Sequence, residues 1–381
     1  MIFENLILNN EIWSKLQNAF KNKKIPNAYI FSGIEGIGKE AHAIEFAALL
    51  NCKRITGDGN ACGDCRACIR IKSFQHEEIH YIRPLPTQKS KTELDANLVE
   101  EINQFYKRKS KNPYHKMELK NANIISINTI RAIKKKLFYT KGDGDWSIVI
   151  ITEAEKLCSK KAEAANSLLK ILEEPPDKTL FILLTSKINL ITETILSRCQ
   201  KHYFPKIQDS ILKKFIVEQN FGKDINEGYI ELSHGSINEL QNIIDTKRID
   251  NLKEVIECFY STEIINIEKF LSIMKEINTK NDFLKYIHHL KVCTKDLYQL
   301  SESNSNKLIE YKFLYNKYNE ILNLFPKSSW IEIINLLNEC SRDFSNNVNF
   351  TLSLYALIIN IQYCLKGDKK HISRLEVIKE L

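Results

Sequence analysis

The stretch that most constrains the fold is a glycine-rich loop between a short apolar segment and a helical pattern. Residues 28–31 are apolar, residues 32–40 read Ser-Gly-Ile-Glu-Gly-Ile-Gly-Lys-Glu, and a helical pattern follows over residues 41–50. Glycines let a backbone close around an anion, and a helix N-terminus supplies N–H donors to it. The sequence therefore predicts a phosphate-binding loop inside an α/β domain. Its candidate binding residues are Gly33, Gly36, Gly38 and Lys39.

The residue after the lysine argues against ATP hydrolysis. A hydrolytic loop carries Ser or Thr there to hold Mg²⁺, and this chain carries Glu40. A carboxylate about 4 Å from a phosphate oxygen repels it by about 4 kcal/mol at an effective dielectric of roughly 20. In P-loop ATPases a second apolar strand ends in two acidic residues, the first of which holds Mg²⁺ through water. The matching run here, residues 148–151, is followed by Thr152 and Glu153, so the first acid is also missing. We expect no competent hydrolysis; the sequence leaves open whether the loop still holds ADP.

Four of the ten cysteines cluster directly after this helical pattern. They are Cys52, Cys62, Cys65 and Cys68. Two Cys-x2-Cys steps can wrap a tetrahedral ion, and four thiolates leave no position for water, so a structural zinc site is predicted. An iron–sulfur triplet would continue with Cys and Pro, where this chain has Lys72 and Ser73, so zinc is favoured over iron.

The chain changes character near its middle. Apolar runs typical of buried parallel strands recur at residues 148–151 and 179–185. From about residue 207 onward helical periodicity replaces them, with apolar faces such as Phe350, Leu354, Leu357 and Ile361. The 381 residues have room for about two or three domains, so we expect an α/β part followed by an all-α part.

Residues 84–121 form a basic arm whose role the sequence does not assign. A helical face carries Leu94, Leu98, Ile102 and Phe105, and residues 106–116 mix lysines and arginine with aromatic side chains. Such a run can contact a phosphate backbone. The favoured interpretation is an inserted surface arm with a solvated charged face.

Charge and hydropathy restrict the location and partners further. The net charge of +8 permits contact with DNA without demonstrating it. No stretch approaches the 18 or more consecutive apolar residues that a membrane span needs, and residues 1–10 lack a basic flank and a long apolar core. We expect a cytoplasmic protein.

Three motifs together resemble one family. They are the Asn-x-Leu-Leu-Lys-x-Leu-Glu-Glu-Pro-Pro run of residues 166–176, the Ser-Arg-Cys triplet of residues 197–199, and the four-cysteine insertion after the loop helix. This set resembles the delta-prime and gamma/tau subunits of the bacterial DNA polymerase III clamp loader, over about residues 1–246. The resemblance implies an AAA+ α/β domain with a parallel sheet over residues 1–204, carrying a zinc insertion (52–68) and the basic arm (84–121). A small helical lid (205–245) and a helical collar or oligomerisation domain (246–381) would follow.

Within that family, the departures resemble delta-prime, the subunit that does not hydrolyse ATP. Glu40 and Thr152 break the metal site, and Asn238 lies near where a sensor arginine of the lid would be expected. The resemblance implies a stator in a hetero-pentameric ring with gamma/tau and delta, meeting primer–template DNA and the sliding clamp through the assembly. Arg198 would act in trans as an arginine finger on a neighbouring ATP site; a structural salt bridge is the competing interpretation.

Two alternatives from other classes remain at this stage. One is an active gamma/tau-like clamp-loader ATPase, which measurable ATP turnover by the isolated chain would favour. The other is a stand-alone zinc-knuckle DNA-binding protein, which salt-dependent DNA binding by residues 52–120 alone would favour.

Overall fold

The computed structural model forms two compact units. The first comprises residues 1–218 with 235–239, and the second comprises residues 219–234 with 240–381. The structure describes residues 1–86, 96–116, 119, 122–139, 145–158, 162–219, 221, 227–245, 248–277, 280–303, 308–345 and 349–368. Among these residues, no helix is both long enough and apolar enough to cross a membrane. Leu94 of the predicted arm helix lies outside them.

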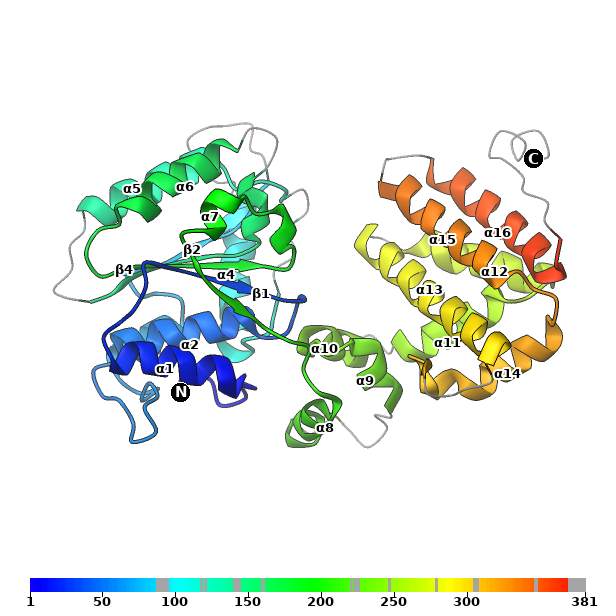
Figure 1. The fold of residues 1–381 in the computed structure, drawn as a ribbon, viewed down its shortest axis with the longest axis horizontal. Helices are drawn as coiled ribbons and strands as arrows, with labels where there is room; N and C mark the ends of the chain where they lie inside the picture. The colour runs from blue at the N-terminus through cyan, green and yellow to red at the C-terminus, as the bar shows by residue number, and fades with distance from the viewer. Residues whose placement is uncertain are drawn as a thin grey trace. The chain divides into compact units, whose positions relative to one another are not determined.

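A five-stranded parallel sheet organises the first unit (Figure 1). Its order is β2-β3-β4-β1-β5. The strands are β1 (Ala28–Ser32), β2 (Ile79–Ile82), β3 (Ser147–Ile151), β4 (Thr179–Thr185) and β5 (Gln200–Tyr203). The three strands that the apolar runs predict, β1, β3 and β4, are the adjacent central strands, where both faces are covered. The two four-residue strands at the edges were not predicted, because β5 is polar and β2 is too short to give a clear pattern.

Helices cover both faces of this sheet, with α1 and α2 on one side and α5, α6 and α7 on the other (Figure 1). The helices of this unit are α1 (Asn10–Lys21), α2 (Lys39–Asn51), α3 (Arg66–Lys72), α4 (Ala96–Lys111), α5 (Ile127–Tyr139), α6 (Glu163–Glu173), α7 (Glu193–Leu196) and α8 (Asp209–Glu218). The core on the α5 and α6 side contains Leu137 and Leu168 packed with Val149 and Phe181. Because α2 is buried around almost its whole circumference, the loop before it is held firmly in place.

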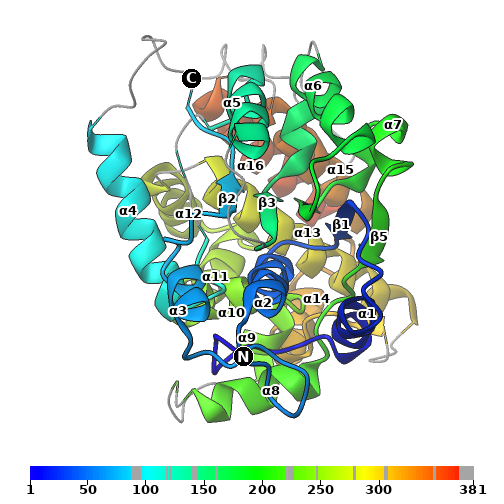
Figure 2. The same ribbon diagram turned by 90° about the vertical axis from the view of Figure 1, so that its left-hand side faces the viewer.

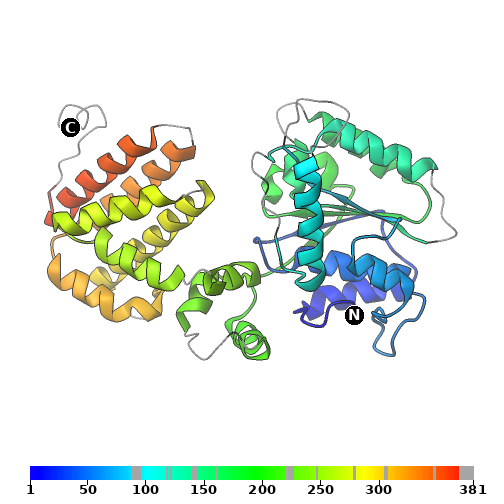
Figure 3. The same cartoon turned by 180° about the vertical axis from the view of Figure 1, so that it is seen from behind.

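Helix α4 belongs to the basic arm and lies along the β2 edge of the sheet (Figures 2 and 3). Tyr106 of α4 contacts the ring of Tyr81 on β2, with the centroids 6.0 Å apart, and stacks on Phe74 at 4.8 Å. Lys107, Arg108 and Lys111 are exposed, as the interpretation of a solvated face requires, but Phe105 and Lys109 are buried. The arm is therefore partly packed into the domain.

The second unit is built from helices alone in the part that the structure describes. Its helices are α9 (Glu227–Ser233), α11 (Arg248–Phe259), α12 (Ile264–Glu276), α13 (Lys280–Ser303), α14 (Tyr315–Leu324), α15 (Trp330–Ser345) and α16 (Phe350–Lys366), and α10 (Ile237–Asp245) spans the division between the units. The predicted apolar face of α16 is confirmed for Leu354, Leu357 and Ile361, which are buried in one core with Ile333 and Leu337 of α15. The side chain of Phe350 lies outside the described ones. The predicted fold class, an α/β domain with a parallel sheet followed by helices, is confirmed. The three-part division at residues 204 and 245 stays a prediction.

Candidate functional site

The glycine-rich loop connects β1 to α2 and adopts a conformation that needs glycine. Gly36 and Gly38 have φ angles of 77° and 92°, in the left-handed region that side chains disfavour. A Cβ at Gly36 would lie 2.1 Å from the hydroxyl oxygen of Ser236, and the N–H of Ile237 donates to the Gly36 carbonyl at 3.1 Å. Residues 235–239 therefore pack directly on the loop.

Lys39 turns back onto the loop that precedes it. Its ammonium donates to the carbonyls of Gly33 at 2.8 Å and Ile34 at 2.6 Å. Burial lowers the pKa of Lys39 to about 8. The donor that a bound phosphate would use is thus satisfied by backbone carbonyls of the same loop.

Glu40, in the first turn of α2, is paired with cations from outside the loop. The Nζ atom of Lys109 lies 2.7 Å from its Oε2, and a guanidinium nitrogen of Arg83 lies 3.7 Å from its Oε1. Only 2% of the Lys109 side chain is exposed. Sequence reasoning missed both cations. The signal for Lys109 was present, because it continues the apolar face of Leu98, Ile102 and Phe105 at helical spacing.

The acidic positions after β3 also have partners in the same chain. Glu153 has a φ angle of 50° and pairs with the ammonium of Lys156 at 2.7 Å. The hydroxyl of Thr185, at the end of β4, donates to Glu155 at 2.7 Å. Thr152 stands in the position of the missing acid, and its backbone N–H donates to the Ile82 carbonyl at 2.9 Å. The two described carboxylates that follow β3, Glu153 and Glu155, are thus each paired within the chain, and Thr152 stands where the Mg²⁺-anchoring acid would be.

The cavity at the loop has a volume of about 110 Å³. The arm contributes much of its lining. The lining residues from the arm are Lys109, Pro113, Tyr114, His115 and Lys116, and Arg83, just before the arm, lines it too. Tyr114 is fixed from two directions: its hydroxyl accepts from the Ile7 N–H at 2.7 Å, and its carbonyl accepts from the Asn238 side chain at 3.0 Å.

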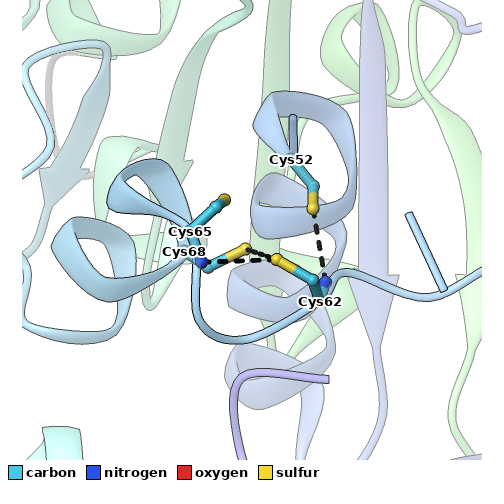
Figure 4. Close-up of side chains that lie close together, drawn as sticks. All are labelled: Cys52, Cys62, Cys65 and Cys68. Atoms are coloured by element: carbon cyan, nitrogen blue, oxygen red, sulfur yellow. Dashed lines mark hydrogen bonds between the residues drawn. The ribbon is translucent and has the colours of Figure 1, made fainter. Parts of the chain in front are cut away.

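The four clustered cysteines converge at the other end of α2 (Figure 4). All four Sγ atoms lie within 4.8 Å of one another, and those of Cys62 and Cys68 are 4.0 Å apart. Sulfurs around a tetrahedral zinc ion, with bonds of about 2.3 Å, stand about 3.8 Å apart, so the spacing fits. Backbone N–H groups of Cys62 and Cys65 donate to the sulfurs of Cys52 and Cys62, both at 3.3 Å. The cluster could hold a metal ion, as the sequence predicts.

Arg198 lies just after the short helix α7, away from the loop. Its guanidinium pairs with Glu173 at 2.8 Å and donates to the Thr194 carbonyl at 2.9 Å. The side chain is 37% exposed, and it is not among the residues that line the cavity of its own chain. Among the described residues, its one carboxylate partner within 4 Å is Glu173. Both interpretations of Arg198, finger and surface pair, fit this position.

The strand order and the glycine-rich loop after β1 define an AAA+-type α/β protein. The family model described as "DNA polymerase III, delta subunit" matches residues 8–208. The chain belongs to that family.

Curated relatives agree with this assignment. The delta' subunit of DNA polymerase III from Bacillus subtilis is 25% identical over 366 residues, covering 93% of this chain and 96% of that protein. The gamma/tau subunit from Mycoplasma genitalium is 29% identical over 352 residues, covering 90% of this chain and 50% of that protein. The tau subunit from Bacillus subtilis is 27% identical, covering 71% of this chain and 40% of that protein. The chain thus spans half or less of the gamma/tau and tau relatives.

A solved structure was matched as well. It is a DNA polymerase III gamma subunit-related protein from Thermotoga maritima, aligned with a TM-score of 0.45 and 15% identity over 93% of this chain and 99% of that chain.

Proposed function

We propose that this chain is a non-hydrolysing, delta-prime-type stator of the DNA polymerase III clamp loader. Its ring neighbours would be gamma/tau and delta subunits, and it would meet primer–template DNA and the sliding clamp through the assembly. The near-complete coverage of a delta' relative, against half or less of the tau-type relatives, supports the delta-prime assignment.

One observation carries the non-hydrolysing part of the proposal. Glu40 occupies the position that should hold Mg²⁺, and its carboxylate is already paired with Lys109 at 2.7 Å. Thr152 replaces the acid that would anchor the metal through water. A chain with neither group has no means of placing Mg²⁺ against a γ-phosphate. The active gamma/tau-like alternative has no support from this geometry.

We propose that Arg198 completes the ATP site of a neighbouring subunit. Its guanidinium is partly exposed, lies outside its own cavity and has a planar fork that can contact two phosphoryl oxygens. The pair with Glu173 at 2.8 Å holds the side chain in one direction without burying it.

We also propose that the four cysteines hold a zinc ion. Thiolate ligands favour Zn²⁺ over hard cations, and a four-thiolate shell has no open coordination position. The ion would stabilise the segment of residues 52–68 and take no part in chemistry.

The experiment uses the reconstituted clamp loader, with this chain and its gamma/tau and delta partners. Arg198→Ala should lower ATP hydrolysis at one interface by up to about 10³-fold, while the other sites hide part of the loss in the total rate. Arg198→Lys should not rescue, because a point charge lacks the fork. Arg131→Ala, at an exposed arginine of α5, is the matched control and should retain the wild-type rate.

Two further measurements make the test decisive. Size-exclusion chromatography should show intact assembly in the Arg198 variants, so that the loss is one of catalysis. The isolated chain should show no ATP turnover. Wild-type hydrolysis and clamp loading by the Arg198→Ala assembly would instead leave Arg198 with only the Glu173 salt bridge.

A further inference from the structure

The arm places a buried ammonium group directly at the phosphate-type loop. Lys109 is at the C-terminal end of α4, its Nζ is 2.7 Å from Glu40, and its side chain is 2% exposed. The same Nζ donates to the carbonyl of His115 at 2.9 Å. A buried ammonium persists only with a counter-charge and hydrogen-bond acceptors, and Lys109 has both.

Aromatic side chains of the arm hold the surrounding charges in place. The guanidinium of Arg83 lies over the ring of Phe105, 4.3 Å from its centroid, and the Lys109 ammonium is 5.7 Å from the same ring. Aromatic faces attract cations, so Phe105 contributes to positioning both. Burial lowers the pKa of Lys109, and the neighbouring Glu40 carboxylate opposes that shift.

The arm is also anchored on several sides, so that Lys109 does not rest on one contact. Tyr106 stacks on Phe74, and the Tyr114 hydroxyl accepts from the Ile7 N–H at 2.7 Å. The side chain of Asn238 donates to the Tyr114 carbonyl at 3.0 Å. Moving the arm away from the loop would therefore break contacts with three other segments.

We propose that Glu40, where the glycine-rich loop meets α2, has made this site a receptor for an ammonium group in place of phosphate. Its resident ligand is Lys109 of the chain's own inserted arm, and this occupancy excludes nucleotide. The proposal accounts for the basic arm and for Glu40 together, because each supplies the charge that the other lacks. It goes beyond the absence of hydrolysis and does not depend on the role of Arg198: a chain could fail to hydrolyse and still bind ADP.

The charges of Glu40 and Lys109 predict opposite effects on anion binding when either residue is replaced. In Glu40→Gln, the Lys109 ammonium loses its counter-ion beside the cavity at the loop, which Lys39 also lines. In Lys109→Gln, the Glu40 carboxylate remains beside the loop and repels anions. Removing the acid should therefore create an anion site, and removing the lysine should not.

The test uses the full chain, with inorganic phosphate as the probe and thermal unfolding as the readout. At about 20 mM phosphate, relative to chloride at equal ionic strength, Glu40→Gln should gain about 2 °C or more in Tm over the change in wild type. Lys109→Gln should show no gain over wild type. Glu77→Gln is the control, because it makes the same charge change at an exposed pair with Arg70; its response should equal that of wild type.

Direct binding to the wild-type chain completes the test. Equilibrium dialysis against about 1 mM ADP with Mg²⁺ should leave less than about a tenth of an equivalent bound. Near-stoichiometric ADP on the wild-type chain would overturn the proposal while leaving the non-hydrolysing stator intact. Equal phosphate responses of Glu40→Gln and Glu77→Gln would also overturn it. If Lys109→Gln does not fold, the proposal is still tested by comparing the phosphate-induced change in Tm among wild type, Glu40→Gln and Glu77→Gln.

Discussion

The two ends of helix α2 make opposite use of their ligand-binding groups. At its N-terminus, Lys39 and Glu40 contact groups of the same chain, the loop carbonyls and Lys109. At its C-terminus, Cys52 faces three further thiols within 4.8 Å. At the first end the charged side chains are already paired within the chain, and at the second end four thiols with little attraction for one another lie close together.

This difference shows which observation identifies a site. A thiol is a weak hydrogen-bond donor and a weak acceptor, so four thiols gain little by approaching one another unless an ion joins them. An ammonium and a carboxylate stabilise each other directly. The backbone conformation of a loop therefore indicates which protein family it comes from, whereas the partners of its side chains indicate which ligand it can still bind.

The largest expected effect is at the cysteine end. Cys68→Ser removes a fully buried ligand, so zinc content should fall from about one equivalent to below roughly half, because a three-thiolate site binds far more weakly. Hydrogen exchange over residues 51–69 should speed up, while the sheet stays protected, since the cluster lies in an insertion outside it.

Cys158→Ser is the matched control for this prediction, because Cys158 is a half-buried cysteine outside the cluster. It should keep about one equivalent of zinc. Elemental analysis of protein purified without chelator measures both variants. Iron in place of zinc, or full zinc in Cys68→Ser, would contradict the contrast between the two ends.

The next effect is at the loop end and concerns stability. Lys109→Met leaves the carboxylate of Glu40 without its closest cation and should cost about 3 kcal/mol. The double variant Lys109→Met with Glu40→Met removes both charges and should recover most of that loss, because an apolar pair can replace a buried ion pair. Denaturant unfolding of the single and double variants measures the coupling.

A more exposed pair between the loop and the arm provides the control. Lys116 contacts Glu35, with 32% and 57% of their side chains exposed. Lys116→Met should cost no more than about 0.5 kcal/mol, as surface pairs usually do. A Lys109→Met variant as stable as Lys116→Met would show that Lys109 is not a structural ligand of the loop.

The sequence predicted the elements whose residues repeat a clear pattern. The continuous apolar runs gave β1, β3 and β4, and the glycine spacing gave the loop and the start of α2. The Cys-x2-Cys steps predicted a cluster that the structure brings together. These signals are local, so that short segments are enough to read them.

What the sequence did not predict depends on contacts between distant segments. Lys109 is 69 residues from Glu40 in the chain, and the basic run around it is typical of a solvated surface. The contact of Asn238 with Tyr114 spans 124 residues. Local patterns indicate that a residue is charged, but only the packing of α4 along β2 shows which charge it meets.

The smallest effect is a pH dependence at the loop end of α2. His42 is 1% exposed; its Nε2 accepts from the N–H of Asn9 at 2.9 Å, and its Nδ1 lies 2.8 Å from the Gly38 carbonyl. These contacts fit a neutral ring that donates through Nδ1, because a second N–H would face the Asn9 donor. Burial lowers the pKa of His42 to about 4.

The sign of the effect follows from the two states of the chain. Unfolded His42 takes up its proton near pH 6.5, at the usual pKa of roughly 6.5, whereas folded His42 takes it up only near its pKa of about 4. Stability is therefore lost as the pH falls from about 6.5 to about 4, at about 1.4 kcal/mol per pH unit, or about 2 kcal/mol by pH 5. His42→Gln should remove that part of the slope. The remaining slope includes the contribution of His80, whose pKa burial also lowers to about 4.

The fluorescence of Trp13 can measure this effect, because its ring lies 6.5 Å from that of His42. Denaturant unfolding would be followed at about pH 7 and about pH 5 in a Trp146→Phe, Trp330→Phe background, so that Trp13 is the remaining tryptophan. If the free energy of unfolding changes equally with pH in the chains with and without His42, the first turn of α2 tolerates a charged ring. Packing at this end of α2 would then be looser than its contacts indicate.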